Sequence, residues 1–254
     1  MMSTLIKLLS PWDFALLAIV TVMGTTLAYV RDPKWKAFLL GLPFPFTVAN
    51  LSLGEQVGPG NVMGMAALLL FTNMVRWLHD RGKIPIVASI AFSAGAYLAA
   101  AVLLNRLVSR TTLEFWLVFT LTFSAGAILL ALLPHRREQA HRSPMPVLAK
   151  IAAIVGVVAA IVLLKRVLGG FMTMFPMVGT IAAYEARRSL WTISRQIPIL
   201  IVTAGPMMAA MWVAQQLLHA SIPVSLAAGW AVFIAVMAPV TILQMREADA
   251  AAGE

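Results

Sequence analysis

Nine long apolar runs, separated by short polar connections, make up almost the whole chain. Of its 254 residues, 61% are hydrophobic and only 11% are charged. A membrane-spanning helix needs roughly 17 to 25 mainly apolar residues, and continuous runs favour a helical bundle over the alternating pattern of a membrane barrel. The sequence therefore predicts an all-α, polytopic membrane protein, with spans near residues 12–30, 37–53, 60–78, 84–105, 113–133, 147–164, 169–184, 191–217 and 222–243.

Several classes of protein are excluded by the composition. The chain has no cysteine, which excludes disulfides, thiolate catalysis and cysteine-bound metals. The formal charge of +9 comes from basic clusters between apolar runs, where topology and anionic lipid explain them, so we expect no nucleic-acid partner. His135 and His141 lack the spacing of a zinc-binding helix, and there is no paired-carboxylate or nucleophile motif. We therefore expect a protein that is not an enzyme and that holds no cofactor or metal.

The distribution of lysine and arginine predicts the orientation. If all nine runs cross and the N-terminus lies outside, 14 of the 19 Lys and Arg residues face the cytoplasm and 5 face outside. If the two proline-containing runs were hairpins that do not cross, the same residues would divide 11 to 8. Cytoplasmic loops carry an excess of basic residues. The full-crossing arrangement is therefore preferred, with the C-terminus in the cytoplasm.

Two short apolar segments interrupted by helix breakers occupy corresponding places in the two halves. They are residues 40–47 and 169–180, and each follows a full-length run and a basic cluster. The segments organise the chain into a four-span repeat (1–110), a connecting span with a basic loop (111–146), a second four-span repeat (147–245) and a short acidic tail (246–254). One span between the repeats turns the second upside down, so we expect a 4 + 1 + 4 inverted repeat.

The interrupted segments predict a substrate site between residues 41–56 and 170–185. Proline removes an amide donor and obstructs the carbonyl four residues earlier, and the freed carbonyls and nearby hydroxyls can bind a cation or a polar substrate. Simple proline kinks in packed helices are the alternative. The candidate substrate-binding residues are Pro43, Pro45, Thr47, Asn50, Thr173, Pro176, Thr180 and Tyr184.

Ionisable residues near the same segments are candidates for coupling or gating, because charges at membrane depth are costly. The candidates are Glu55, Glu185 and Arg188. For Glu55 a solvated loop position is the preferred explanation, and for Glu185 an ion pair with Arg187 or Arg188 is an equal alternative. Asp13, beside Trp12, is expected in the headgroup layer.

A second internal repeat consists of residues 92–96 and 123–127, which share the sequence Phe-Ser-Ala-Gly-Ala. Small side chains let two helices approach closely. We therefore expect these stretches to pack on adjacent antiparallel spans.

The sequence around Phe171 to Arg188 contains glycine, an apolar pair, Phe-Pro, small residues, an aromatic-acidic pair and arginine, in that order. This order is similar to the GlpM family of small four-span bacterial inner-membrane proteins. Leu42-Pro43 and Glu55 depart from the pattern in the first half. The resemblance implies a four-span folding unit, here doubled with one extra span, and a place in the bacterial cytoplasmic membrane.

Together these features predict a secondary transporter that works by alternating access and is coupled to protons or sodium. The substrate would be a small polar or anionic metabolite or a lipid headgroup. A non-transporting scaffold subunit of a cell-envelope complex and a passive channel are the alternatives. The expected partners are the lipid bilayer, the substrate, Na+ or H+, and either a second copy of the chain or a partner membrane subunit.

Overall fold

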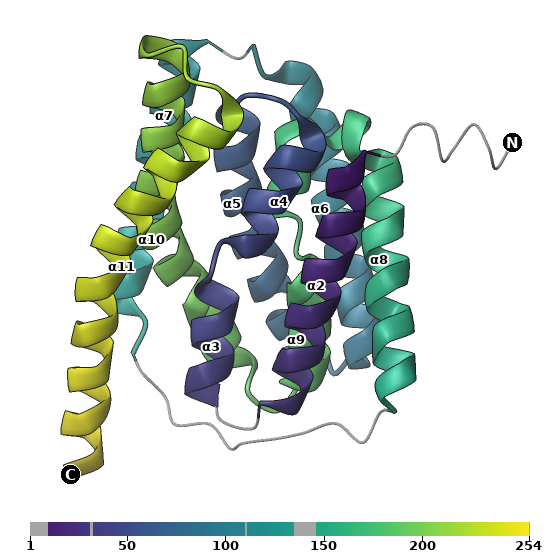
Figure 1. The fold of residues 1–254 in the computed structure, drawn as a ribbon. Coiled ribbons are helices and arrows are strands. Elements are labelled where there is room, and N and C mark those ends of the chain that lie inside the picture. Colours follow the sequence, from purple (N-terminus) through teal and green to yellow (C-terminus); the bar gives the residue numbers. More distant parts are fainter. Residues whose placement is uncertain (1–9, 31–32, 110, 135–145, 254) are drawn as a thin grey trace, which may run out of the picture.

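All regular structure in the described part of the chain is helical (Figure 1). The computed structural model describes residues 10–30, 33–109, 111–134 and 146–253. The basic connection with His135 and His141, and the lysine and arginine residues at 7, 31 and 110, lie outside this part. The elements are α2 (Pro11–Tyr29), α3 (Pro33–Gly41), α4 (Phe44–Leu53), α5 (Pro59–Arg76), the π-helical η1 (Trp77–Arg81), α6 (Ile86–Leu107), α7 (Thr112–Leu132), α8 (Val147–Leu168), the 3-10 helix η2 (Gly169–Met174), α9 (Met177–Glu185), α10 (Leu190–Leu217) and α11 (Ile222–Gly253).

Six of the described helical stretches are long and apolar enough to cross a membrane. Two shorter apolar stretches, Pro11–Leu27 and Phe38–Leu53, accompany them. The prediction of a helical, multi-pass membrane protein is therefore confirmed, while the count of nine spans stays a prediction. The six long stretches are Pro59–Arg81, Ile86–Leu107, Thr112–Leu132, Leu148–Met174, Leu190–Leu217 and Ile222–Val240.

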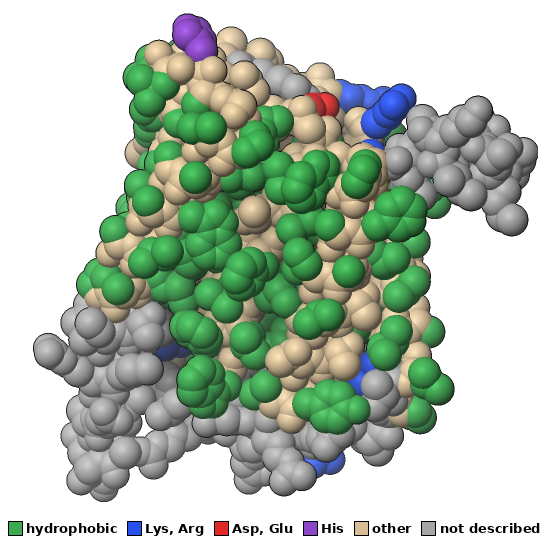
Figure 2. Space-filling model, in the orientation of Figure 1, with side chains coloured by type: hydrophobic (Ala, Val, Ile, Leu, Met, Phe, Trp, Pro, Cys, Tyr) green, Lys and Arg blue, Asp and Glu red, His purple; other side chains and the backbone are tan. Residues whose placement is uncertain are grey.

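The surface of the bundle is apolar between its two ends. Hydrophobic side chains cover most of the face shown in Figure 2, and the visible charged side chains gather near the ends. Large residues such as Leu113 and Leu148 are 77% and 80% exposed, which suits contact with lipid tails. The apolar stretch of α10 is 72% buried, against 17% for that of α7, so α10 forms the centre of the bundle.

Helix packing places α5 and α10 side by side in the interior, with α7 against both of them. Helix α6 packs on α5, and α11 packs on α10. Helix α2 lies between α4 and α8 at one edge of the bundle (Figure 1). The core between these helices consists of aliphatic, methionine and aromatic side chains, including Phe115 stacked on Trp212 with ring centroids 4.9 Å apart.

Both interruptions occur where the prolines predict them. Helix α3 ends at Gly41 and α4 begins at Phe44, while η2 ends at Met174 and α9 begins at Met177. In each case the carbonyl of the proline before the new helix accepts a hydrogen bond from the amide four residues later, at 2.9 Å from Pro43 and 2.8 Å from Pro176. The structure differs from the expectation in the second segment, whose first part is a 3-10 helix.

The two Phe-Ser-Ala-Gly-Ala stretches do not share one tight interface. Gly126 lies against α10, where an added Cβ would meet Ile201 at 2.5 Å, whereas a Cβ on Gly95 would meet nothing within 4 Å. Gly95 and Ala96 are exposed on α6. The predicted packing is therefore wrong, because the bundle places α6 on α5 and α7 on α10.

Candidate functional site

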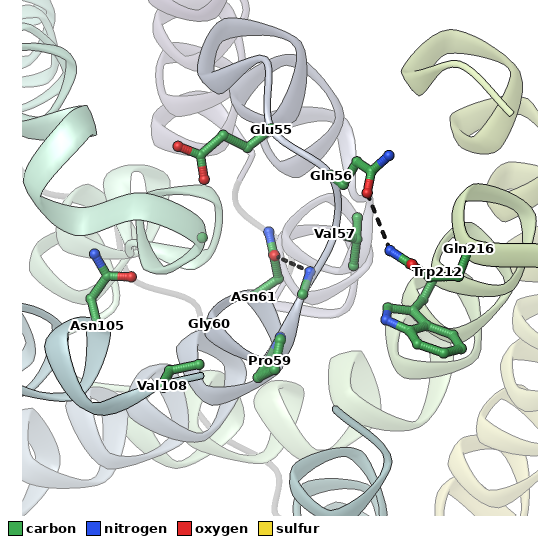
Figure 3. Close-up of a pocket in the computed structure, with 12 residues that line it drawn as sticks. Glu55, Gln56, Val57, Pro59, Gly60, Asn61, Asn105, Val108, Trp212 and Gln216 are labelled. Carbon is green, nitrogen blue, oxygen red and sulfur yellow. Dashed lines mark hydrogen bonds between the residues drawn. The ribbon is translucent and has the colours of Figure 1, made fainter. Parts of the chain in front are cut away.

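A polar cavity of about 140 Å³ opens at the end of the bundle where α2 begins (Figure 3). It lies between the α4–α5 connection, the last turns of α6, the start of η2 and the end of α10. Figure 3 shows the Glu55 carboxylate and the side-chain amides of Asn61 and Asn105 bordering the same opening. The lining residues are Glu55, Gln56, Val57, Gly58, Pro59, Gly60, Asn61, Asn105, Val108, Gly170, Trp212 and Gln216.

Asn61 joins the first turn of α5 to the second interrupted segment. Its side-chain oxygen accepts from the Gly58 amide at 2.9 Å, and its Nδ2 donates to Thr173 Oγ1 at 3.0 Å. Thr173 Oγ1 in turn donates to the Gly170 carbonyl at 2.7 Å. Because Asn61 and Thr173 are 2% and 4% exposed, these hydrogen bonds form a buried polar junction beneath the cavity.

The backbones also approach closely at this junction. An added Cβ on Gly170 would lie 2.7 Å from the Asn61 amide nitrogen and 2.8 Å from Asn61 Oδ1. A Cβ on Gly60 would face the Gly170 Cα at 3.6 Å. Glycine at position 170 is therefore required for η2 to contact the start of α5.

Glutamine side chains attach the α4–α5 connection to the last two helices. The Val57 amide donates to Gln215 Oε1 at 2.8 Å, and Gln215 Nε2 donates to Ser225 Oγ at 2.6 Å. Gln216 Nε2 donates to Gln56 Oε1 at 3.2 Å across the wall of the cavity. The connection that carries Glu55 is thus held on both sides, by η2 through Asn61 and by α10 through Gln215.

A buried ion pair lies near the same end of the bundle. Lys165 Nζ, in the last turn of α8, lies 2.9 and 2.7 Å from the two carboxylate oxygens of Asp13. Ser52 Oγ donates to the same carboxylate, which is also bonded to the Ser10 amide at 2.6 Å. Asp13 is 3% exposed, because Lys165 and Ser52 replace water around its carboxylate, and its predicted depth in the headgroup layer stays a prediction.

A second buried ion pair lies toward the other end of α8. Lys150 Nζ is 2.8 Å from Glu185 Oε1, and the two side chains are 5% and 1% exposed. The sequence offered an ion pair as one explanation of Glu185, but this partner comes from α8 rather than from the neighbouring arginines. Arg187 lies over the Tyr184 ring at 5.2 Å, and Arg188 is exposed.

The remaining predicted site residues have several different surroundings. Thr47 Oγ1 donates to the Pro43 carbonyl at 2.8 Å and accepts from Trp230 Nε1 of α11 at 2.9 Å. Thr180 Oγ1 donates to the Met177 carbonyl at 2.9 Å. The Asn50 side chain is fully buried, and within the described residues neither its nitrogen nor its oxygen has a hydrogen-bond partner.

Of the predicted site residues only Glu55 is among those that line the cavity, and none of the eight predicted substrate-binding residues is. Helix α4 packs against η2, and the polar junction between the halves runs through Thr173 and Asn61. Asn61 was not among the predicted substrate-binding residues, although its place three residues after Gly58, at the start of α5, is a helix N-terminal signal in the sequence. Lys150 and Lys165 were also missed, because a basic residue near the end of an apolar run resembles an ordinary snorkelling lysine.

The donor set favours hydrogen bonding over metal ligation. Among the described residues there is no group of three or more histidine, cysteine or acidic side chains that could hold a metal ion. Side-chain amides, backbone groups and one carboxylate instead line the cavity, and such groups bind polar organic molecules.

No protein-family model matches the chain, and no match was found among curated proteins or solved structures.

Proposed function

We propose that this protein is a secondary transporter for a small polar or anionic metabolite or a lipid headgroup. The observation that carries the proposal is the polar cavity beside the buried junction that Asn61, Thr173 and Gly170 form between the start of α5 and the second interrupted segment. Non-helical backbone at membrane depth is tolerated where it is buried in protein or lines a water-filled cavity. Interrupted helices that meet beside a polar cavity are typical of transporter substrate sites.

The two ion pairs of α8 supply a second support. Lys150 and Lys165 are 15 positions apart, a rise of about 22 Å along an α-helix, and each is paired with a buried carboxylate. Buried charges in a membrane protein usually mark a transport pathway or a coupling site. Alternate breaking and re-forming of contacts at the two ends of α8 would suit alternating access, with Glu185 in the coupling or gating role.

We further propose that the fold is a 4 + 1 + 4 inverted repeat in which both interrupted segments cross the membrane. The packing supports this arrangement, since α5 with α6 is matched by α10 with α11, and the connecting helix α7 contacts both central helices. The proposed orientation places the N-terminus outside a bacterial cytoplasmic membrane and Arg76, Arg187 and Arg195 toward the cytoplasm. Proton or sodium gradients would then supply the driving force.

Transport is tested with purified protein in liposomes on a solid-supported membrane. Charge movement is recorded as amino acids, organic acids, sugar phosphates and nucleosides are added under an imposed Na+ or proton gradient. Scrambling of fluorescent headgroup-labelled lipids is followed in parallel by dithionite quenching. We expect one class of compound, or the labelled lipid, to move, and we expect Pro45→Ala and Glu185→Gln to abolish that movement.

Asp80→Asn is the matched control, because this carboxylate is exposed in η1 and should not affect transport. Solute movement that follows its own gradient and ignores Na+ and protons would indicate a passive channel. If wild-type protein with an intact melting transition moves none of the solutes and scrambles no lipid, the transporter proposal is wrong. Stable co-purification of a membrane partner would then support a scaffold.

A further inference from the structure

The surroundings of the Lys165 ammonium are those of an occupied cation site. Its Nζ lies within hydrogen-bond distance of three oxygens, namely Asp13 Oδ1 at 2.9 Å, Asp13 Oδ2 at 2.7 Å and the Ser52 carbonyl at 3.3 Å. An ammonium group has three N–H donors and no acceptor. Every donor therefore has an oxygen partner, and all of these oxygens come from the first half of the chain.

The carboxylate is held in place independently of the lysine. Ser52 Oγ donates to one carboxylate oxygen, and the Ser10 amide donates to the other at 2.6 Å. Asp13 is 3% exposed and the Lys165 side chain is 14% exposed, so water has little access to the hydrogen bonds between them. The oxygen arrangement is thus fixed by α2 and α4 and would remain if the lysine were absent.

The Ser52 carbonyl adds the negative end of a half-helix to the site. Helix α4 ends at Leu53, and Gly54 turns the backbone into the left-handed region at φ 69°, so this carbonyl has no amide of its own helix to accept from. The C-terminal end of a helix carries a partial negative charge. In transporters with interrupted helices, the carbonyls at such ends coordinate the coupling cation.

We propose that Asp13 and the Ser52 carbonyl form a binding site for a monovalent cation of the Na+ class, and that Lys165 is its tethered occupant in this conformation. One carboxylate and neutral oxygens balance a single positive charge, whereas a divalent ion would require more acidic ligands. The lysine comes from the second half of the chain and the oxygens come from the first. Movement of α8 away from α2 would therefore remove the ammonium and leave a buried carboxylate that a free cation neutralises.

This inference deepens the proposed function, because it names the coupling ion and its site. Exchange between Lys165 and Na+ would link cation binding to the position of α8 relative to α2 and α4. The second ion pair provides a contrast, since within the described residues Lys150 contacts the Glu185 carboxylate and no half-helix carbonyl. Lys150 is therefore the matched control for an equally buried lysine without a cation site.

The test measures thermal unfolding of purified Lys165→Ala in NaCl and in choline chloride at equal ionic strength. Without the tethered ammonium, Na+ should occupy the site, and the melting temperature should rise saturably by roughly 5–10 °C once Na+ is a hundredfold above its dissociation constant. Wild type, Lys150→Ala and the double variant Asp13→Asn/Lys165→Ala should melt at the same temperature in both salts. If Lys165→Ala cannot be purified, Lys165→Met, which retains the apolar stem, replaces it.

Equal melting temperatures of Lys165→Ala in the two salts would overturn the proposal. A Na+ response of the same size in Lys150→Ala or in the double variant would also overturn it, because the effect would then not depend on Asp13. The measurement needs no transport substrate. Na+ binding without any solute movement would contradict the transporter and leave the site standing, whereas Na+-independent transport with no Na+ binding would do the reverse.

Discussion

Gly170 is the residue whose replacement should most directly separate the second interrupted segment from the start of α5. A methyl group at this position would lie 2.7 Å from the Asn61 amide nitrogen, so the Gly170→Ala variant must push η2 away from α5 or displace the Asn61 side chain. We expect it to lower the free energy of unfolding by about 1–3 kcal/mol, the usual cost of overpacking. The measurement is thermal or denaturant unfolding in detergent.

Gly156→Ala is the control for this substitution. Gly156 is an exposed position inside α8 whose added Cβ would meet nothing within 4 Å. Replacing it should be neutral or should stabilise the helix by up to about 1 kcal/mol, because alanine favours helix more than glycine does. Equal stabilities of the two alanine variants would show that the close approach at Gly170 does not limit the fold.

At the scale of single residues, the sequence shows that a polar side chain needs a hydrogen-bond partner more readily than it shows which residue that partner is. Thr173, predicted as a substrate-binding residue, hydrogen-bonds in the polar junction, because a hydroxyl beside helix breakers has to find a partner in an apolar bundle. Its partner Asn61 is 112 positions earlier, and no local pattern reports such a distance. For the same reason, the sequence did not indicate that Asp13 pairs with Lys165, which is 152 positions later.

At the scale of helices, losing one member of the Lys150–Glu185 pair should lower the free energy of unfolding by more than the net stabilisation that the intact pair provides. Removing one partner leaves the other charge buried between α8 and α9 without this ion pair. The single variants Lys150→Met and Glu185→Met should each lose about 3–5 kcal/mol of unfolding free energy. The double variant removes both charges and keeps similar volume, so it should recover most of that loss.

A double-mutant cycle measured by denaturant unfolding checks this expectation. The result expected is a large favourable coupling between the two positions. Additive losses, with the double variant as unstable as the sum of the singles, would contradict a direct contact between the two side chains. Lys150→Met and Asp80→Asn provide an additive reference pair, since Asp80 is exposed in η1.

Helix boundaries were more predictable than helix contacts. The breaks at Pro43 and Pro176 follow from the missing amide and the rigid ring of proline, which act on the local backbone whatever the tertiary structure. The 3-10 form of η2 was not predicted, because it depends on Gly169, whose φ of 52° turns the chain where α8 ends. The separation of the two Phe-Ser-Ala-Gly-Ala stretches depends on which helices α6 and α7 pack against, and the repeated sequence does not determine that packing.

At the scale of the whole molecule, span length and composition establish that the chain is a helical membrane protein, because both are local quantities that the bilayer thickness constrains. The arrangement of α5, α7 and α10 around one centre required the structure, since every apolar run satisfies the same length condition. The distribution of charged residues links the individual spans to the arrangement of the whole molecule. Lysine and arginine between the runs predict one orientation, and that orientation depends on both interrupted segments crossing.

Cysteine labelling tests that crossing cleanly, because the native chain contains no thiol. Arg166 and Arg188 flank the second interrupted segment and both are exposed, as are the reference positions Ser109 and Asp80. If the segment crosses, a membrane-impermeant maleimide should label Arg166→Cys and Ser109→Cys from outside intact cells, and Arg188→Cys and Asp80→Cys only in inverted membrane vesicles. A hairpin that returns to its own side would instead put positions 166 and 188 on the same face. That result would remove the inverted repeat, because the second half would then keep only three crossings, and its last two spans would run in the same direction as the last two spans of the first half instead of the opposite direction.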